Sequence, residues 1–125
     1  LQAFLEPALA FARAHADDEE FGTPVSQALR LLEEATATVM ARSQGNPDEI
    51  GAAATSYLRL LALAALAYLW ARAAMISRDR EGEFYRAKLA TARFFMQRLL
   101  PETKSLHAAI MAGAAPVMEL DAGLF

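Results

Sequence analysis

Residues 57–75 have the sequence YLRLLALAALAYLWARAAM, and this stretch decides the fold because it is apolar on every side of a helix. Between Leu60 and Ala71 it carries no charge. A surface helix has a polar face, so a helix that is apolar all round is expected to be surrounded by other elements. We therefore predict that residues 60–71 form the buried centre of a helical bundle.

The same stretch is short for a membrane span. The uncharged run between Arg59 and Arg72 has 12 residues, whereas crossing a bilayer takes about 20. A buried helix is therefore favoured, and no membrane span is expected.

The composition indicates one folded helical domain. Of 125 residues, 55% are hydrophobic and 22% charged, with only 6 Gly and 5 Pro, which argues against disorder. A chain of this length buries one core, so we predict a single domain, residues 1–125, and expect it to be an excised domain or a trimmed fragment because it starts at Leu1. With 0 Cys, a disulfide framework and a thiolate metal site are excluded, which agrees with a cytoplasmic location.

Capping residues and prolines predict the helix boundaries. The first apolar repeat covers residues 1–16, although Pro7 could mark its true start. Thr23-Pro24 and Asn46-Pro47 each combine a capping side chain with a proline, which predicts that the second and third helices begin there. The third helix would end near Ser77.

The fourth helix carries a lengthwise seam in which apolar residues alternate at steps of four and three: Tyr85, Leu89, Ala92, Met96 and Leu99. Pro101 interrupts this pattern and should kink the helix. The sequence thus predicts an all-α fold, an antiparallel four-helix bundle whose last helix is kinked at Pro101. A short apolar C-terminal tail should dock onto this bundle or onto a neighbour.

Charge is unevenly distributed, although the formal net charge is only -3. Up to Ala71 there are nine acidic residues and four arginines, and residues 72–104 hold eight basic and four acidic residues. The basic half could face an anion, but we favour the alternative that acidic and basic faces meet across the bundle or lie in water. The acidic run at residues 17–20 is expected to be a solvated connector rather than a metal site.

No strong catalytic motif is present. The chain lacks a Gly-rich phosphate loop and a Glu-x-x-His pair, and His15 and His107 each stand alone, as packing or surface residues do. The basic, aromatic-containing stretch at residues 86–98 is a weak indication of nucleic-acid binding, which the acidic net charge and the apolar seam oppose. We predict no catalytic, cofactor-binding or metal-binding residue and no nucleic-acid partner.

Two segments resemble a known family. The run FYRAKLATARFFMQRLLPETKSLHAAIMAG at residues 84–113, followed by PVMELDAGLF at residues 116–125, resembles the C-terminal helical domain of bacterial acyl-CoA dehydrogenases. The branch that looks most similar contains 3-methylmercaptopropionyl-CoA dehydrogenase. The segment GAAATSYLRLLALAALAYLWARAA at residues 51–74 resembles the preceding helix of that domain, whereas the first two helices resemble it only loosely.

The resemblance implies a parent flavoenzyme of fatty acid metabolism that removes hydrogens from the α and β carbons of an acyl-CoA thioester and passes a hydride to FAD. The flavin and the catalytic base would belong to an upstream dehydrogenase core, so no glutamate here is given that role, and this fragment alone carries no active site. Its expected task is to pack on that core and to help the subunits of a homo-oligomer associate. The alternative is a free-standing helical module for protein interaction or ligand sensing, without catalysis.

A candidate interface follows from apolar and basic residues that the predicted core does not need. Consecutive residues lie about 100° apart on a helix, so Phe94 and Phe95 cannot both face the seam. Arg86 or Arg93 could also contact the phosphates of CoA. The predicted interface consists of Phe84, Arg86, Arg93, Phe94, Phe95, Leu124 and Phe125.

Overall fold

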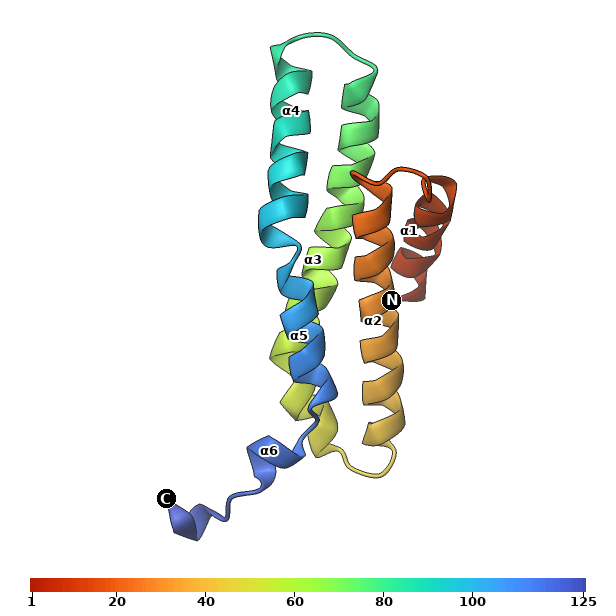
Figure 1. Ribbon diagram of the computed structural model, residues 1–125. Coiled ribbons are helices and arrows are strands. Elements are labelled where there is room, and N and C mark those ends of the chain that lie inside the picture. The colour runs from red at the N-terminus through yellow and green to blue at the C-terminus, as the bar shows by residue number, and fades with distance from the viewer.

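Neighbouring helices run antiparallel along one long axis in the computed structural model, which describes residues 1–125 (Figure 1). The fold is all-α, as predicted, and has no strand. The helices are α1 (Gln2–Ala14), α2 (Gly22–Ser43), α3 (Asp48–Arg78), α4 (Glu83–Phe94), α5 (Glu102–Met111) and the short α6 (Ala115–Met118). A π-helical turn, Phe95–Leu99, joins α4 to α5, and a 3-10 turn, Ala122–Leu124, follows α6.

Helix α3 is the central helix, with α2, α4 and α5 packed along it and α1 beside the upper part of α2 (Figure 1). Its buried side is formed mainly by small residues, which let neighbouring backbones approach closely. Most of the larger core residues come from outside α3 and include Phe21, Leu29 and Leu32, all fully buried. The buried side of α3 consists of Ala53, Leu60, Leu63, Ala64, Ala67, Ala71, Ala74 and Ser77.

The prediction that residues 60–71 are enclosed on every side is wrong for one face of the helix. Leu60, Ala64 and Ala67 are fully buried, but Leu66 and Leu69 are exposed to solvent. The physical reason is that α2, α4 and α5 all pack on the same side of α3 and α1 lies mainly on α2, so no element covers the opposite side.

The kink predicted at Pro101 is present, but the seam before it has a different register. In the π-helical turn, the N–H of Leu100 donates to the carbonyl oxygen of Phe95 at 2.9 Å, five residues back. A π turn holds one residue more than the corresponding α turn, so the buried position moves along the chain by one. Leu100 is therefore buried and Leu99, the predicted seam residue, is exposed.

The observed helix starts follow only part of the capping prediction. Pro7 lies inside α1 and does not start it. Helix α2 begins at Gly22 without a side-chain cap from Thr23; instead, Oδ1 of Asp18 accepts hydrogen bonds from the N–H groups of Glu20 and Phe21. At the start of α3, Pro47 occupies the N-cap position without a side-chain cap, but the predicted contribution of Asn46 is present one residue earlier, since its Oδ1 accepts from the N–H of Asp48 at 3.1 Å.

The C-terminal tail, residues 115–125, does not dock onto this bundle. It leads away from the lower end of the helices (Figure 1) and contains no buried residue. Of the two predicted alternatives, docking onto its own bundle is wrong, and docking onto a neighbour stays a prediction; the apolar residues of the tail are in contact with solvent.

Gly22 occupies a position that no larger residue can take without a shift of the backbone. A Cβ atom at this position would lie 1.9 Å from the backbone oxygen of His15, where the chain leaves α1 and enters α2. The close approach of these two backbone segments sets the position of α1 against the bundle.

We predict that Gly22→Ala lowers the free energy of unfolding by about 1–3 kcal/mol, because overpacking forces the α1–α2 connection apart. Gly51→Ala is the matched control: Gly51 lies exposed in α3 with nothing within 4 Å of the added Cβ atom. Alanine there should raise stability by about 0.5–1 kcal/mol. Urea unfolding of both variants measures the difference, and equal stability of Gly22→Ala and the unaltered chain would contradict the packing argument.

Candidate interface

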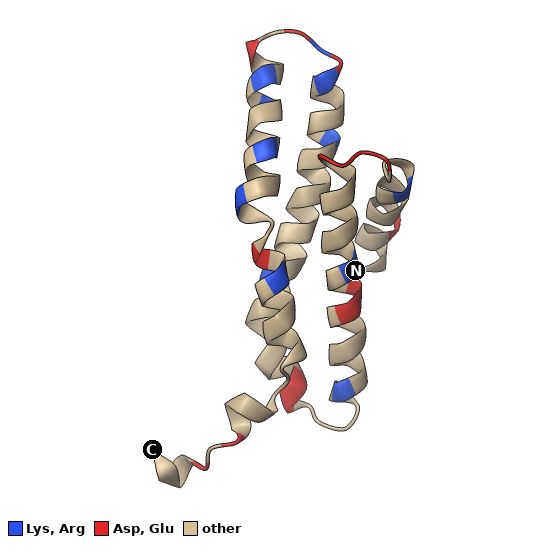
Figure 2. Cartoon of the chain, viewed as in Figure 1, with Lys and Arg blue, Asp and Glu red and all other residues tan.

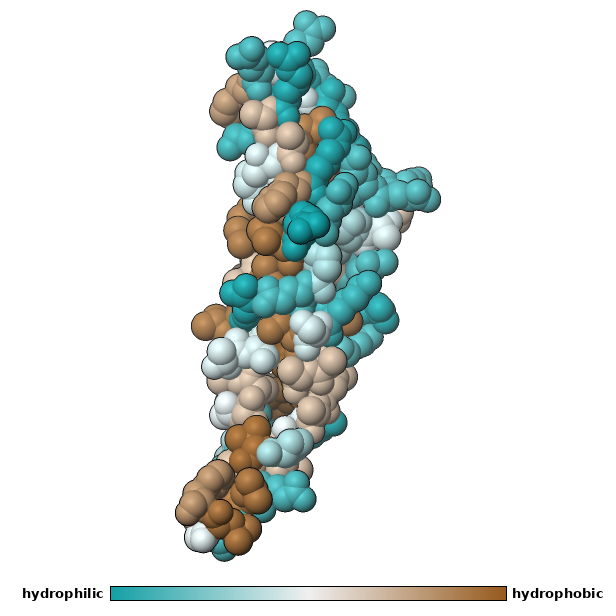
Figure 3. Space-filling view, turned by 60° about the vertical axis from the view of Figure 1, so that its left-hand side comes forward, coloured by the Kyte–Doolittle hydropathy of each residue, from teal (hydrophilic) through white to brown (hydrophobic).

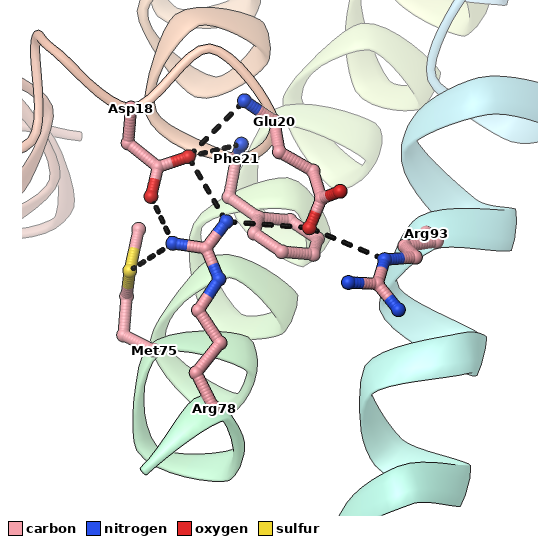
Figure 4. A network of polar contacts seen from close by, with 6 residues as sticks. All are labelled: Asp18, Glu20, Phe21, Met75, Arg78 and Arg93. Carbon is pink, nitrogen blue, oxygen red and sulfur yellow. Dashed lines mark hydrogen bonds and ion pairs between the residues drawn. The ribbon is translucent and has the colours of Figure 1, made fainter.

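A polar cluster joins the α1–α2 connector to the ends of α3 and α4 (Figure 4). The guanidinium of Arg78 on α3 pairs with the carboxylate of Asp18 and lies 3.2 Å from Oε1 of Glu20. Nε of Arg93 on α4 lies 3.2 Å from the same Glu20 oxygen, and Arg78 also stacks 4.8 Å from the ring centroid of Phe21. We call Asp18, Glu20, Arg78 and Arg93 the polar clamp.

The polar clamp corrects the prediction that residues 17–20 are merely a solvated connector. Asp18 and Glu20 hold the connector against the basic part of the chain, and Figure 2 shows this acidic segment beside the upper part of α3. The interpretation that the acidic and basic halves meet across the bundle therefore agrees with the structure. Arg93, a candidate for CoA contact, is already paired with a carboxylate of its own chain.

The charges of the clamp shift the pKa values of its members. The hydrogen bond from Arg78 lowers the pKa of Asp18 to about 2. Glu20 has a lowered pKa, chiefly through its hydrogen bond with Arg93, and the pKa of Arg78 is raised by Asp18. Both carboxylates are therefore ionised at neutral pH and suit a bracing role rather than general acid catalysis.

A second ion pair joins α3 to α5. Nε and an outer guanidinium nitrogen of Arg59 bind the two carboxylate oxygens of Glu102 at 2.5 and 2.8 Å. The pKa of Glu102 is lowered by this contact and that of Arg59 is raised. Both side chains are exposed, so the pair fixes geometry more than it stabilises the fold.

The remaining polar residues do not assemble a reaction centre. No group of three His, Asp or Glu residues is placed to hold a metal ion. His15 packs against the ring of Phe11, with ring centroids 4.3 Å apart. Nε2 of His107 lies 3.1 Å from Oε2 of Glu34, close enough for an ion pair when the imidazole is protonated, but the angles are not those of a hydrogen bond.

The predicted interface residues do not form one surface in the structure. Phe84 and Phe94 are exposed on α4, whereas Phe95 is buried in the core of this bundle, so the two adjacent phenylalanines do face different ways. Arg86 is exposed and has only a 3.9 Å contact with Glu83. Leu124 and Phe125 lie at the opposite end of the molecule, in the tail (Figure 1).

An exposed apolar face of α3 was missed by the sequence analysis. Leu58, Leu66, Leu69 and Ile76 are between 43% and 67% exposed, and their spacing places them on the side of the helix opposite its buried residues. We call these four residues the α3 stripe. The sequence did contain a signal, since alanine predominates on the buried side and larger residues make up the stripe. Figure 3 shows hydrophobic residues gathered along one side of the molecule and over the tail.

The length and composition of α3 would also suit a membrane span, with a mean hydropathy of 1.7 over its most apolar window and 39% of that window buried in this bundle. This is weak evidence, because the core helix of a soluble protein has the same properties. Charged residues on the neighbouring helices, such as Arg30, Glu34 and Glu102, would be costly within a bilayer. The exposed stripe is therefore better explained by contact with protein.

A groove lies between the C-terminal half of α2 and the N-terminal half of α3. It has a volume of about 470 Å³, and its walls include Val39, Met40, Ile50, Tyr57 and Leu58. We call it the α2–α3 groove. It meets the α3 stripe at Leu58, which belongs to both.

Comparison with known families gives one match. A family model described as acetyl-CoA dehydrogenase C-terminal like matches residues 1–121, which include α1 to α6 and therefore both apolar surfaces. No curated protein matches the chain. The resemblance stated for the C-terminal part is thus confirmed at the level of the family and extends over α1 and α2, whereas the particular branch stays a prediction.

We predict that Asp18→Asn removes about 1–2 kcal/mol of stability at pH 7, because the asparagine keeps the shape of the side chain but loses its charge. The folded-state pKa of Asp18 lies below its ordinary value of 3.8, so the contribution is present above pH 4 to 5 and is lost as the pH falls to about 2. The variant and the unaltered chain should therefore converge in stability at low pH.

Urea unfolding between pH 7 and pH 2 measures this convergence. Asp17→Asn is the control, because Asp17 is exposed, makes no ion pair and should not alter the unfolding curve. A stability difference for Asp18→Asn that is the same at pH 7 and pH 2 would show that the clamp does not act through charge.

Proposed function

The chain belongs to the acetyl-CoA dehydrogenase C-terminal-like family, and from this membership we propose that it packs through the α3 stripe onto the catalytic core of an FAD-dependent acyl-CoA dehydrogenase. The parent enzyme would carry out α,β-dehydrogenation of acyl-CoA thioesters in cytoplasmic fatty acid metabolism and would be a homo-oligomer. Within that enzyme this chain is an accessory domain, and its own residues contribute packing and subunit association.

The α3 stripe is the observation that carries this proposal. Its four residues lie along most of a 31-residue helix and are uncharged, and a row of large exposed apolar residues is typical of a protein interaction site. Trp70 and Phe84 extend the row towards α4, since Nζ of Lys88 lies 5.6 Å from the Trp70 ring and 5.4 Å from the Phe84 ring. Phe84, a residue of the predicted interface, therefore lies next to the stripe.

The positions of the charged residues support an accessory role. The ionised carboxylates of the clamp are bound to arginines, and the one apolar groove next to the stripe contains no charged residue. A dehydrogenase of this class needs a flavin and a base that removes the α proton, and the proposal assigns both to the core. Arg86, exposed and weakly paired, is the residue of α4 that could still reach a CoA phosphate.

We predict that Leu69→Asp weakens attachment of this domain to the dehydrogenase core by at least tenfold, because a carboxylate would be transferred into an apolar interface. The isolated chain should unfold at nearly the same urea concentration with or without the substitution, since Leu69 is already 54% exposed. Binding of the chain to the separately expressed core, measured by calorimetry, gives the affinity.

Ala37→Asp provides the control for added charge, because Ala37 is exposed on α2, away from the stripe. It should bind the core as the unaltered chain does. If Leu69→Asp also binds with unaltered affinity, the α3 stripe is not the contact surface.

A further prediction concerns the cofactor. The chain alone should neither quench the fluorescence of added FAD nor reduce it when an acyl-CoA is supplied, because the flavin site is assigned to the core. Fluorescence titration and absorbance at the flavin maximum test the two statements. Binding of FAD by this chain at micromolar concentration would overturn the assignment.

A further inference from the structure

The α2–α3 groove continues the channel that α1 fills. Phe4 and Phe11 of α1 pack against the ring of Tyr68, with ring centroids 6.2 and 5.5 Å apart. Leu1, the first residue before α1, contributes to the end of the groove. Beyond it, helix α5 lies along one side of α2 and α3 (Figure 1), and no helix of residues 1–125 covers their other side, on which α1 packs. A short helical segment with apolar side chains would complete the row that α1 begins.

The polar groups at this groove are already satisfied within the chain. The hydroxyl of Thr36 donates to the carbonyl oxygen of Leu32 at 2.7 Å, so in its 2.7 Å contact with Tyr57 the tyrosine hydroxyl must be the donor. Both hydroxyl protons are used, and the other walls are apolar. The groove therefore suits apolar side chains and offers no partner for a charged head group.

The tail supplies side chains of this kind. Five of its residues are large, apolar and at least 58% exposed: Val117, Met118, Leu120, Leu124 and Phe125. The start of the tail is held at the lower end of α2 and α3, because Arg42 donates to the carbonyl oxygen of Met111 at 2.9 Å and Glu49 accepts from the N–H of Ala114 at 3.1 Å. Arg42 lies two residues after the groove residue Met40 and therefore on nearly the opposite side of α2, so these contacts hold the tail on the side away from the groove.

The path of the chain directs the tail away from its own groove. Helices α1 and α5 lie on opposite sides of the α2–α3 pair (Figure 1), and the groove is on the side of α1. Gly113, with a φ of +80°, ends α5 and turns the tail outward. The tail therefore projects into solvent from the lower end of the bundle (Figure 1), where a second molecule can receive it.

We propose that the tail of one copy packs into the α2–α3 groove of a second copy, and that the exchange is reciprocal. Two identical tail–groove contacts form a closed dimer with two-fold symmetry, which does not continue into a filament. The charged tail residues Glu119 and Asp121 remain in solvent while the apolar residues enter the groove. This inference rests on the self-association part of the proposed function and not on docking to the dehydrogenase core.

Cysteine cross-linking tests the contact, because the natural sequence has 0 Cys. One chain carries Met40→Cys in the groove and the other Leu124→Cys in the tail; both positions are exposed, so neither substitution disturbs the core. Mild oxidation of the mixture should give a covalent dimer of twice 13.6 kDa, and either chain alone should give little. A chain with both substitutions that cross-links only within itself would overturn the exchange, as would the absence of any cross-link.

Sedimentation measures the strength of the contact. Phe125→Asp and Met40→Asp should each raise the dissociation constant of the dimer at least tenfold without a loss of helix content by circular dichroism. A mixture of these two variants keeps one intact tail–groove pair and should form a mixed dimer. Leu69→Asp, which tests docking to the core, should leave the dimer intact. A chain that stays monomeric at several hundred micromolar, or a dimer that only Leu69→Asp abolishes, would overturn the proposal.

Discussion

Close packing against the alanine side of α3 is the interaction on which the rest of the structure depends. Ala64, Ala67, Ala71 and Ala74 are fully buried, and their small side chains let α2, α4 and α5 approach the same side of one helix. Because these three helices all pack on this side of α3, no helix remains to cover its opposite side. The exposed α3 stripe is therefore a consequence of how the core is built, and not a separate feature added to a complete bundle.

Ion pairs determine how the shorter elements are attached, but they contribute less energy than the core. A fully buried leucine such as Leu29 or Leu60 contributes about 1.5–3 kcal/mol. An exposed pair such as Arg59–Glu102 contributes little, because solvent screens both charges. The polar clamp is more shielded, since the side chain of Asp18 is only 17% exposed. Together with the buried ring of Phe21, it holds the α1–α2 connector against α3 and α4.

The helical spacing of apolar residues, together with the positions of capping residues and prolines, was sufficient to predict the helices, the central position of α3 and the kink at Pro101. They could not predict which side of α3 is covered, because an apolar pattern does not reveal how many neighbours a helix has. The buried seam position is Leu100 and not the predicted Leu99 because of the π-helical turn. The single extra residue of this turn leaves no distinct pattern in the sequence. The clamp joins residues 60 positions apart, Asp18 and Arg78, and such a pair becomes visible only once the helices are placed.

The two apolar surfaces suit partners of different kinds because they differ in shape. The α3 stripe follows a straight helix over much of its length, so a matching partner needs a preformed surface of similar length, as a folded core provides. The α2–α3 groove is short and lies between two helices, so a short segment can fill it without a domain behind it. Since both surfaces meet at Leu58, occupation of the groove adds apolar side chains next to the stripe and lengthens the surface offered to a folded partner. Self-association and docking would then favour each other through contact between the bound tail and the docked core, and neither would require a change in the bundle.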